Sequence, residues 1–504
     1  MQESSWQEND DRSELNLDIP DLAPAQHKSL TSNSQVGKIC AAPSNDREFD
    51  VNTKADRTVA VNLPNSPSFP QKLYQGRRGK AAVVLTAIWG GTITLHLVSW
   101  GPWVVWGLTG LLWMQAFRFL FASPKPAMLP LSESNQADWP YVSLLVAAKN
   151  EEAVIARLVE SICNLDYPID CYELWAIDDN STDGTALVLE QLTKQYPQLK
   201  VWSRGANASG GKSGALNQVL PQTRGEFVGI FDADATVTPD LLRSVVPVFS
   251  STQVGAVQVR KSIANAPLNF WTRSQEAEMA LDSFFQQQRI AIGGVGELRG
   301  NGQFMRRTAL ESCGGWNEET ITDDLDLTLR LHLDQWDIEF LAFPAVSEEG
   351  VTNAKALWHQ RNRWAEGGYQ RYLDYWKLIF RNRMGTGKTW DLFGFWVSQY
   401  FLPTVALPDC LMSIVLRRMP LASPLTFMTI TLSLVGMFVG LRRTRKETKF
   451  FDIKRVFAIL MQTLSSTVYM LHWLLVGAVT ARISVRPKQL KWVKTVHQGT
   501  ANIK

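Results

Sequence analysis

The sequence predicts an α/β fold in which an open, mostly parallel sheet lies between apolar segments long enough to cross a membrane. Between Tyr141 and about Leu341, short apolar runs alternate with helical stretches, a pattern typical of a parallel sheet covered by helices on both faces. Apolar segments of about 20 residues precede and follow this region. The chain has 504 residues, a formal net charge of +3 and 45% apolar residues, which indicates neither a nucleic-acid-binding protein nor a wholly disordered one.

The N-terminal part of the chain is predicted to be a disordered cytosolic tail over residues 1–75. It is rich in Asn, Ser, Asp and Pro, and its apolar residues are scattered without a period. The basic cluster Arg77–Lys80 follows, and basic residues favour the cytosolic side of a membrane. Two transmembrane helices are predicted over 81–122, as Ala81–Trp100 and Pro102–Ala122. Two crossings return the chain to the cytosol, so the domain that follows is expected to be cytosolic.

Five strands and four helices are predicted in this domain, over residues 140–350. The strands are Tyr141–Ala148, Tyr172–Ile177, Val201–Trp202, Phe227–Phe231 and Val254–Val259. The helices are Glu152–Leu165, Thr185–Tyr196, Ser213–Leu220 and Pro239–Phe249. Ligands of open α/β sheets bind beyond the carboxyl ends of the strands, so the residues directly after each strand are the candidates for a site.

Acidic side chains follow three of these strands. Glu151 comes after the first, Asp179 after the second, and Asp232 and Asp234 after the fourth. Residues at i and i+2 of an extended turn point the same way, so Asp232 and Asp234 are expected to face one divalent cation. Oxygen ligands suit Mg²⁺ or Mn²⁺, with diphosphate oxygens in the remaining positions. An Asp-x-Asp alone is more often an acidic turn, but the other acidic strand ends favour the site.

The Gly-Gly-Lys-Ser stretch at 210–213 is a partial match to the phosphate-binding P-loop. The full motif requires Gly five positions before Gly211, where the chain has Ala206. The sequence therefore disfavours a nucleotide triphosphatase. Lys212 remains a candidate for contact with a diphosphate.

Two groups of polar residues stand out between Thr322 and Trp364. Asp323, Asp324 and Asp326 begin an apolar helical pattern, and a helix start holds its side chains in fixed places. Downstream, Gln360, Arg363 and Trp364 fall at i, i+3 and i+4, so they share one face of a helix. An amide, a guanidinium and an indole suit a phosphate and a sugar-like ring. Taken separately, the acids also fit a helix cap, and the Arg–Trp pair also fits a membrane-interface anchor.

The C-terminal third is predicted to return to the membrane. Residues 351–388 alternate aromatic and basic side chains and are predicted to form helices lying in the membrane interface. Residues 392–481 hold three further candidate spans, and 482–504 form a basic tail; the spans are Leu392–Leu416, Leu421–Leu441 and Val456–Ala481. The basic loop 442–455 and the basic tail are both expected in the cytosol, which three simple crossings do not satisfy. A re-entrant first span leaves the loop outside, whereas a hairpin within the last span satisfies both.

The acidic stretches and the Gln-x-x-Arg-Trp motif together resemble the membrane-bound family-2 glycosyltransferases, the group that includes cellulose and hyaluronan synthases. The shared pattern is Asp, Asp-x-Asp, Asp and Gln-x-x-Arg-Trp, and here 35 residues lie between Asp324 and Gln360. The resemblance covers about residues 140–380. The usual Thr-Glu-Asp reads Thr-Asp-Asp at 322–324, a departure that leaves the acid in place.

The resemblance implies a Rossmann-like nucleotide-sugar-binding domain, the type A glycosyltransferase fold, inserted between transmembrane helices. It implies that Glu151 and Asp179 contact uracil or ribose and that Lys212 lies near the diphosphate. Asp232 and Asp234 would bracket the sugar nucleotide, with Asp234 as the principal ligand of Mg²⁺ or Mn²⁺.

On the acceptor side, the resemblance implies that Asp324 is the general base. Gln360, Arg363 and Trp364 match the platform for the acceptor and the diphosphate. A single displacement on an α-linked donor gives a β-glycoside, so the expected enzyme is an inverting, UDP-sugar-dependent hexosyltransferase.

Within that group, the long polar tail, the two leading spans and the modest C-terminal membrane part resemble cyanobacterial glycolipid synthases. Those enzymes move glucose from UDP-glucose to diacylglycerol, which implies a lipid acceptor and a place in the plasma or thylakoid membrane. A processive polysaccharide synthase is the alternative, since Gln-x-x-Arg-Trp accompanies chain-forming enzymes. A membrane ATPase is disfavoured by the incomplete P-loop, and an inactive sugar-nucleotide sensor by the presence of every expected acid. No residue pattern in the sequence distinguishes glucose from galactose or fixes the oligomeric state.

Overall fold

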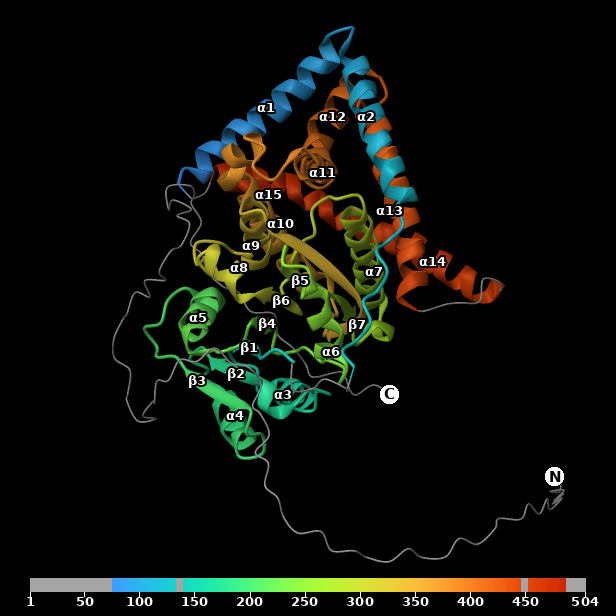
Figure 1. Ribbon diagram of the computed structural model, residues 1–504. Coiled ribbons are helices and arrows are strands. Elements are labelled where there is room, and N and C mark those ends of the chain that lie inside the picture. Colours follow the sequence, from blue (N-terminus) through green and yellow to red (C-terminus); the bar gives the residue numbers. More distant parts are fainter. Residues whose placement is uncertain (1–74, 133–138, 446–451, 486–504) are drawn as a thin grey trace, which may run out of the picture. The chain divides into compact units, whose positions relative to one another are not determined.

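The computed structural model describes residues 75–132, 139–445 and 452–485 (Figure 1). The predicted tail at 1–75 and the predicted basic tail at 482–504 lie outside the described residues, apart from residue 75 and residues 482–485.

The domain predicted at 140–350 is built on a seven-stranded mixed sheet (Figure 1). The strands are β1 Val142–Ala148, β2 Tyr172–Asp178, β3 Leu199–Ser203, β4 Phe227–Phe231, β5 Val254–Ile263, β6 Gln303–Arg306 and β7 Asp337–Glu348, in the spatial order β3-β2-β1-β4-β6-β5-β7. β6 is antiparallel to β4 and β5, and the remaining pairs are parallel. The five predicted strands are confirmed, and the sheet is mostly parallel as expected. β6 and β7 were not predicted from the sequence.

Helices cover both faces of this sheet. They are α3 Ile155–Cys163, α4 Thr185–Thr193, α5 Gly211–Val219, α6 Leu241–Val245, α8 Arg307–Ser312 and α9 Asp323–Leu333. Successive side chains of a strand point to opposite faces. Accordingly, Leu144 of β1 packs in one core with Leu158 of α3, and Leu145 packs in the other core with Leu216 of α5. Short 3₁₀ turns complete the domain at Ile169–Cys171, Leu220–Gln222, Val246–Ser250 and Ala266–Leu268.

Two long helices, α7 Phe270–Ala291 and α10 Ala354–Phe380, connect the sheet to the apolar segments (Figure 1). The sequence pattern does not predict α7. Polar side chains on it, among them Gln286 and Arg289, are buried by neighbouring elements, so the helix lacks the single apolar stripe that marks an amphipathic helix.

Helix α10 corrects part of the prediction for residues 351–388. Tyr369, Arg371 and Tyr375 are buried inside the protein, so for these residues the assignment to the membrane interface is wrong. The basic side chain of Arg371 meets a buried carboxylate rather than lipid headgroups. Trp376 and Phe380, at the C-terminal end of the helix, are exposed.

Five apolar helical segments are long enough to cross a membrane, which is consistent with membrane association. They are α1 Arg77–Leu97, α2 Gly101–Phe121, Thr386–Leu416, α13 Ser423–Thr444 and Ile453–Val485. The third comprises α11 Thr386–Trp396, a π-helical turn Val397–Phe401 and α12 Leu402–Leu416; the fifth comprises α14 Ile453–Met470, a 3₁₀ turn Leu471–Leu474 and α15 Leu475–Val485. Each predicted span coincides with one of them. The fifth runs as one helical segment, without the reverse turn that a hairpin requires.

A buried ion cluster connects α7 and α10 to the sheet domain. The carboxylate of Glu297 lies 2.7 Å from Arg299 Nη1, 3.0 Å from Arg371 Nη2 and 3.6 Å from Arg289 Nη1. Burial raises the pKa of Glu297, but the three guanidinium groups outweigh burial and hold the pKa far below its usual range. One fully buried carboxylate therefore anchors both long helices.

Glu297→Ala is expected to lower the free energy of unfolding by about 3 to 5 kcal/mol, because it leaves buried guanidinium groups without their counter-ion. Equilibrium unfolding of the purified protein in detergent measures the loss. Glu311→Ala is the matched control, since its side chain is 43% exposed and pairs with Arg307 on the same helix. The control is expected to change stability by less than about 1 kcal/mol. Equal losses in the two variants would contradict the anchoring role of Glu297.

Candidate active site

A cavity of about 320 Å³ lies at the carboxyl ends of β1, β4 and β7, where the sheet meets α7, α9 and α10. Eight of the nine site residues predicted from the sequence line it, namely Glu151, Lys212, Asp232, Asp234, Asp324, Gln360, Arg363 and Trp364. The ninth, Asp179, does not line the cavity. Its carboxylate is 2.5 Å from Arg204 Nη1 and 3.7 Å from Lys149 Nζ, and its N–H donates to Ala148 O at the end of β1. Asp179 thus lies beside the cavity in an ion pair.

The Asp-x-Asp motif directly follows β4, and its two carboxylates have different surroundings. Asp232 lies 2.5 Å from Lys212 Nζ, and its side chain is 42% exposed. Asp234 is buried and accepts a hydrogen bond of 3.0 Å from the N–H of Glu349. Burial lowers the pKa of Lys212, but Asp232 and then Asp323 outweigh it and raise the pKa above its usual value. Lys212 is therefore a fixed positive charge in the cavity.

Asp324 lies in the first turn of α9, as the sequence pattern predicts. Its Oδ1 accepts a hydrogen bond of 2.8 Å from the N–H of Leu325. Burial, and then the charge of Asp323, raise the pKa of Asp324 to about 6 against the opposing effect of Lys212. Gly300, at φ +83°, faces this carboxylate, and a Cβ placed there would stand 3.4 Å from Asp324 Oδ2. A carboxylate whose pKa is raised in this way is a better proton acceptor than an ordinary one, as the predicted general base requires.

The Gln-x-x-Arg-Trp residues share one face of α10, and Trp364 is flanked by two cations. Arg361 lies over its ring with 4.0 Å between guanidinium carbon and ring centroid, and Lys261 Nζ lies 5.2 Å from the centroid. Arg361 is buried, donates to Gln360 Oε1 at 2.8 Å and also pairs with Glu278 of α7. These contacts hold the indole in one orientation against the cavity.

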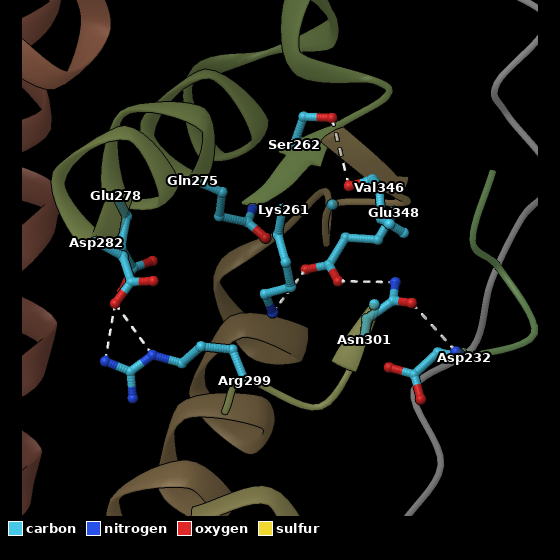
Figure 2. Close-up of polar contacts among 12 residues, drawn as sticks. Asp232, Lys261, Ser262, Gln275, Glu278, Asp282, Arg299, Asn301, Val346 and Glu348 are labelled. Carbon is cyan, nitrogen blue, oxygen red and sulfur yellow. Dashed lines mark hydrogen bonds and ion pairs between the residues drawn. The ribbon is translucent and has the colours of Figure 1, made fainter. Parts of the chain in front are cut away.

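Several residues that line the cavity were not predicted from the sequence: Lys261, Glu278, Asp282, Arg299, Glu348 and Glu349. Figure 2 shows how some of them connect. Asn301 accepts from the N–H of Asp232 at 3.3 Å and donates to Glu348 at 3.2 Å, and Glu348 lies 3.2 Å from Lys261 Nζ. Arg299 donates to Asp282 at 2.8 Å on the α7 side.

A local signal existed for only some of these residues. Glu348 and Glu349 are at and directly after the end of β7, so the strand-end rule finds them once β7 is recognised. Lys261, Asp282 and Arg299 come from a strand, a helix and a loop with no local pattern, and only the fold brings them together.

The charge balance of the cavity suits a cation. Nine carboxylate side chains and five cationic side chains line it; the carboxylates are Glu151, Asp232, Asp234, Glu278, Asp282, Asp323, Asp324, Glu348 and Glu349, and the cations are Lys212, Lys261, Arg299, Arg363 and Arg371. Among the described residues, no group of three or more His, Cys, Asp or Glu forms a complete metal site. Asp232 and Asp234 supply two carboxylates at the cavity, and the predicted divalent cation would need its other ligands from a bound diphosphate.

Comparison with known proteins identifies the family. Residues 140–367 match the glycosyltransferase-like family 2. Over 459 residues the chain is 60% identical to β-monoglucosyldiacylglycerol synthase of Nostoc sp. (strain PCC 7120), a match that covers 91% of this chain and 96% of the relative. This chain belongs to the family-2 glycosyltransferases. The synthase of the same name from Synechocystis sp. (strain PCC 6803) is 59% identical over 425 residues, which is 84% of this chain and 89% of the relative.

Solved structures similar to this glycosyltransferase are more distant. A mannosyltransferase of Pyrobaculum calidifontis, in complex with GDP-Man and Mn²⁺, covers 78% of this chain and 99% of its own, at 21% identity and a TM-score of 0.49. Residues 1–349 of Staphylococcus aureus TarS, in complex with UDP-GlcNAc, cover 67% of this chain at 16% identity and a TM-score of 0.37. Likenesses this distant carry no argument about the reaction. The family assignment and the mixed sheet agree with the predicted type A glycosyltransferase fold.

Proposed function

We propose that this glycosyltransferase moves glucose from UDP-glucose to the free hydroxyl of 1,2-diacylglycerol, with inversion, and forms β-monoglucosyldiacylglycerol at the cytosolic face of a membrane. The observation that carries the proposal is the composition of the cavity. It joins the acids and cations predicted for a sugar nucleotide to Met470, Trp473 and Val476, which come from an apolar, membrane-type segment. Identity of 60% to β-monoglucosyldiacylglycerol synthase supports the same choice of substrates.

On the donor side, each proposed role follows from the charge and place of the residue. Glu151 follows β1, lines the cavity and binds the uridine through its ring N–H or ribose hydroxyls. Asp179, beside the cavity after β2, is assigned the same role on the family resemblance alone. Lys212 and Arg363 supply positive charge to the diphosphate, as donors aimed at developing negative charge do. Mg²⁺ or Mn²⁺ held by Asp234 and Asp232 would supply further stabilisation of the departing UDP.

On the acceptor side, Asp324 accepts the proton of the lipid hydroxyl while that oxygen attacks the anomeric carbon. One such carboxylate is enough, because UDP leaves as an anion and needs no proton. Glu278 and Asp282 also line the cavity, but they are ion-paired with Arg361 and Arg299, which suits positioning rather than proton transfer. Gln360 and Trp364 present a polar and an apolar surface to the sugar.

The acid limb of kcat/KM is expected near pH 6, because a general base must be ionised and the pKa of Asp324 is raised to about 6. Activity therefore rises with pH through this range and levels off above it. Asp323→Asn removes the neighbouring negative charge and should move the limb to lower pH with the base intact. Profiles of kcat/KM between about pH 5 and about pH 8 test this. A limb that stays in place in Asp323→Asn would refute the assignment.

The choice between lipid and polymer can be tested in membranes. We expect membranes that contain the protein to transfer label from UDP-glucose into the lipid-extractable fraction, and UDP-galactose to compete poorly. Membranes that carry Asp324→Asn are the control for other transferases. The Gln-x-x-Arg-Trp motif favours a processive glycan synthase, so label in an insoluble polymer would establish that alternative and refute the lipid acceptor.

A further inference from the structure

Four of the five apolar segments form two hairpins whose open ends meet the sheet domain. α1 and α2 are joined at 98–100, and α12 and α13 at 417–422. The other ends make polar contacts with the sheet domain or with α7 and α10, through the pairs Arg77–Asp374, Phe119–Gln288, Lys388–Asp337 and Arg443–Gln287. Each of these segments has one end at the sheet domain and one away from it, as a membrane-crossing helix should.

In the fifth segment, Ile453–Val485, α14 packs against α7 and α13, and α15 packs against α10, α1 and α12. Five side chains of the segment contact α7 or α10 through the pairs Gln462–Arg273, Ser466–Ser274, Tyr469–Glu278, Trp473–Glu278 and Arg482–Glu366, at 2.8 to 3.4 Å. Near its C-terminal end, Ser484 O accepts from Arg78 Nε at 3.0 Å, and Arg78 lies at the start of α1. Both halves of the segment are therefore held at the level of the sheet domain.

The length of the segment makes this arrangement incompatible with a crossing. Twenty residues separate Gln462 from Arg482, which is about 30 Å of helix. The hydrocarbon core of a bilayer is also about 30 Å thick. A helix that crossed the bilayer would carry one of these residues to the far side, away from α7 and α10. Gln462 contacts α7 and Arg482 contacts α10, so the segment runs alongside the sheet domain.

The opposite face of the segment is an exposed apolar stripe. Its side chains recur every three or four residues and are 42% to 82% exposed: Ile453, Phe457, Leu460, Leu464, Val468, Leu471 and Leu474. Residues at this spacing share one face of a helix. Polar groups on one face and exposed aliphatic and aromatic groups on the other are typical of a helix that lies in a membrane surface.

We propose that Ile453–Val485 lies in the plane of the membrane, on the side of the sheet domain. Its apolar stripe, from Ile453 to Leu474, enters the acyl chains. The opposite face packs against α7 and α10 and, in α15, also against α1 and α12. The partner of the stripe is the bilayer itself, since the four crossing helices place the domain-side ends at the membrane surface. The placement does not depend on which acceptor the enzyme uses.

This placement also removes the conflict between the number of predicted crossings and the cytosolic side expected for the basic segments. With four crossings, the Arg77–Lys80 cluster, the basic residues Arg442–Arg445 and Lys454–Arg455, and the end of α15 at Val485 lie on the same side. Of the basic residues at the turns, Arg417 and Arg418 remain on the far side. Met470, Trp473 and Val476 of the in-plane segment line the reactive cavity, so this segment separates the cavity from the acyl-chain layer.

Depth measurement tests the proposal. Phe457, Leu464 and Leu471 are replaced one at a time by Cys in a background with Cys40→Ser and Cys410→Ser, labelled with a fluorophore and reconstituted in phosphatidylcholine–phosphatidylglycerol vesicles. Quenching by lipids with nitroxides at headgroup or mid-chain depth reports each position. We expect all three labels at one shallow depth, about 5–10 Å below the headgroups. A crossing helix would separate the first from the last by about 21 Å, and such a gradient would overturn the proposal.

Labels at Phe427 and Val435 of α13, which are exposed apolar positions on a proposed crossing helix, are the matched control and should differ in depth by about 12 Å. A second measurement uses the unsubstituted chain with protease-cleavable tags at both ends in sealed vesicles. In-plane placement predicts that both tags are cleaved from the same side. Cleavage from opposite sides would overturn the proposal even if a labelled variant did not fold.

Discussion

Replacing Asp324 with Asn is expected to reduce kcat by about 10³-fold and to leave the affinity for UDP nearly unchanged. The reason is that a general base acts in the transition state, where proton transfer contributes about 10²- to 10⁴-fold, and not in ground-state binding. Turnover is measured with UDP-glucose and diacylglycerol, and UDP affinity by direct titration. Asp323→Asn is the matched control, because it removes the adjacent carboxylate in the same cavity and leaves the base. Near-normal kcat in Asp324→Asn would refute the assignment of the base.

Loss of the fold would not explain that result, because Asp324→Asn is expected to be at least as stable as the parent protein without substrate. The pKa of Asp324 in the folded state, about 6, lies above its value in an unfolded chain. Ionisation therefore favours the unfolded state, and the stability from this group falls as the pH rises from about 4 to about 6 and then levels off. The amide side chain of Asn does not ionise, so the variant lacks this pH dependence of stability. A lower Tm at pH 7 in the variant would contradict this account of the Asp324 environment.

Removal of divalent cations is expected to abolish transfer, and Mg²⁺ or Mn²⁺ to restore it. Charge stabilisation at a departing diphosphate is worth several kcal/mol, which corresponds to at least about 100-fold in rate. Asp234→Asn should produce a similar loss and raise the metal concentration needed for half-maximal activity. Glu226→Gln is the control, because Glu226 directly precedes the same strand, β4, at the end remote from the cavity. Full activity in excess chelator would assign the charge stabilisation to Lys212 and Arg363 instead.

The part of the fold with a regular local pattern was predictable. The strands of the parallel half have continuous apolar runs, and β1, β2 and β4 are buried in the structure nearly throughout. β6 has only four residues, Gln303–Arg306, two of them polar, and its ladder depends on β4 and β5 on either side. α7 buries Gln275, Glu278 and Gln288 against other elements, which hides its helical period.

The same distinction applies to the candidate site. Asp232, Asp234 and Asp324 come at element ends, where the sequence pattern reveals them, and all three line the cavity. Lys261 and Arg299 reach it only through long-range packing. The aromatic and basic pattern of α10 was wrongly assigned to the membrane interface. Arg371 pairs with the buried carboxylate of Glu297, which lies 74 residues earlier in the chain, and no pattern around Arg371 in the sequence indicates this partner.

The most direct test of the account uses purified protein in detergent with UDP-glucose and Mg²⁺, with and without 1,2-diacylglycerol. We expect release of UDP to require the lipid and to match, mole for mole, the formation of a lipid-extractable β-glucoside. Asp324→Asn in parallel should form neither product. UDP release that ignores diacylglycerol and accompanies an insoluble glucan would contradict the account.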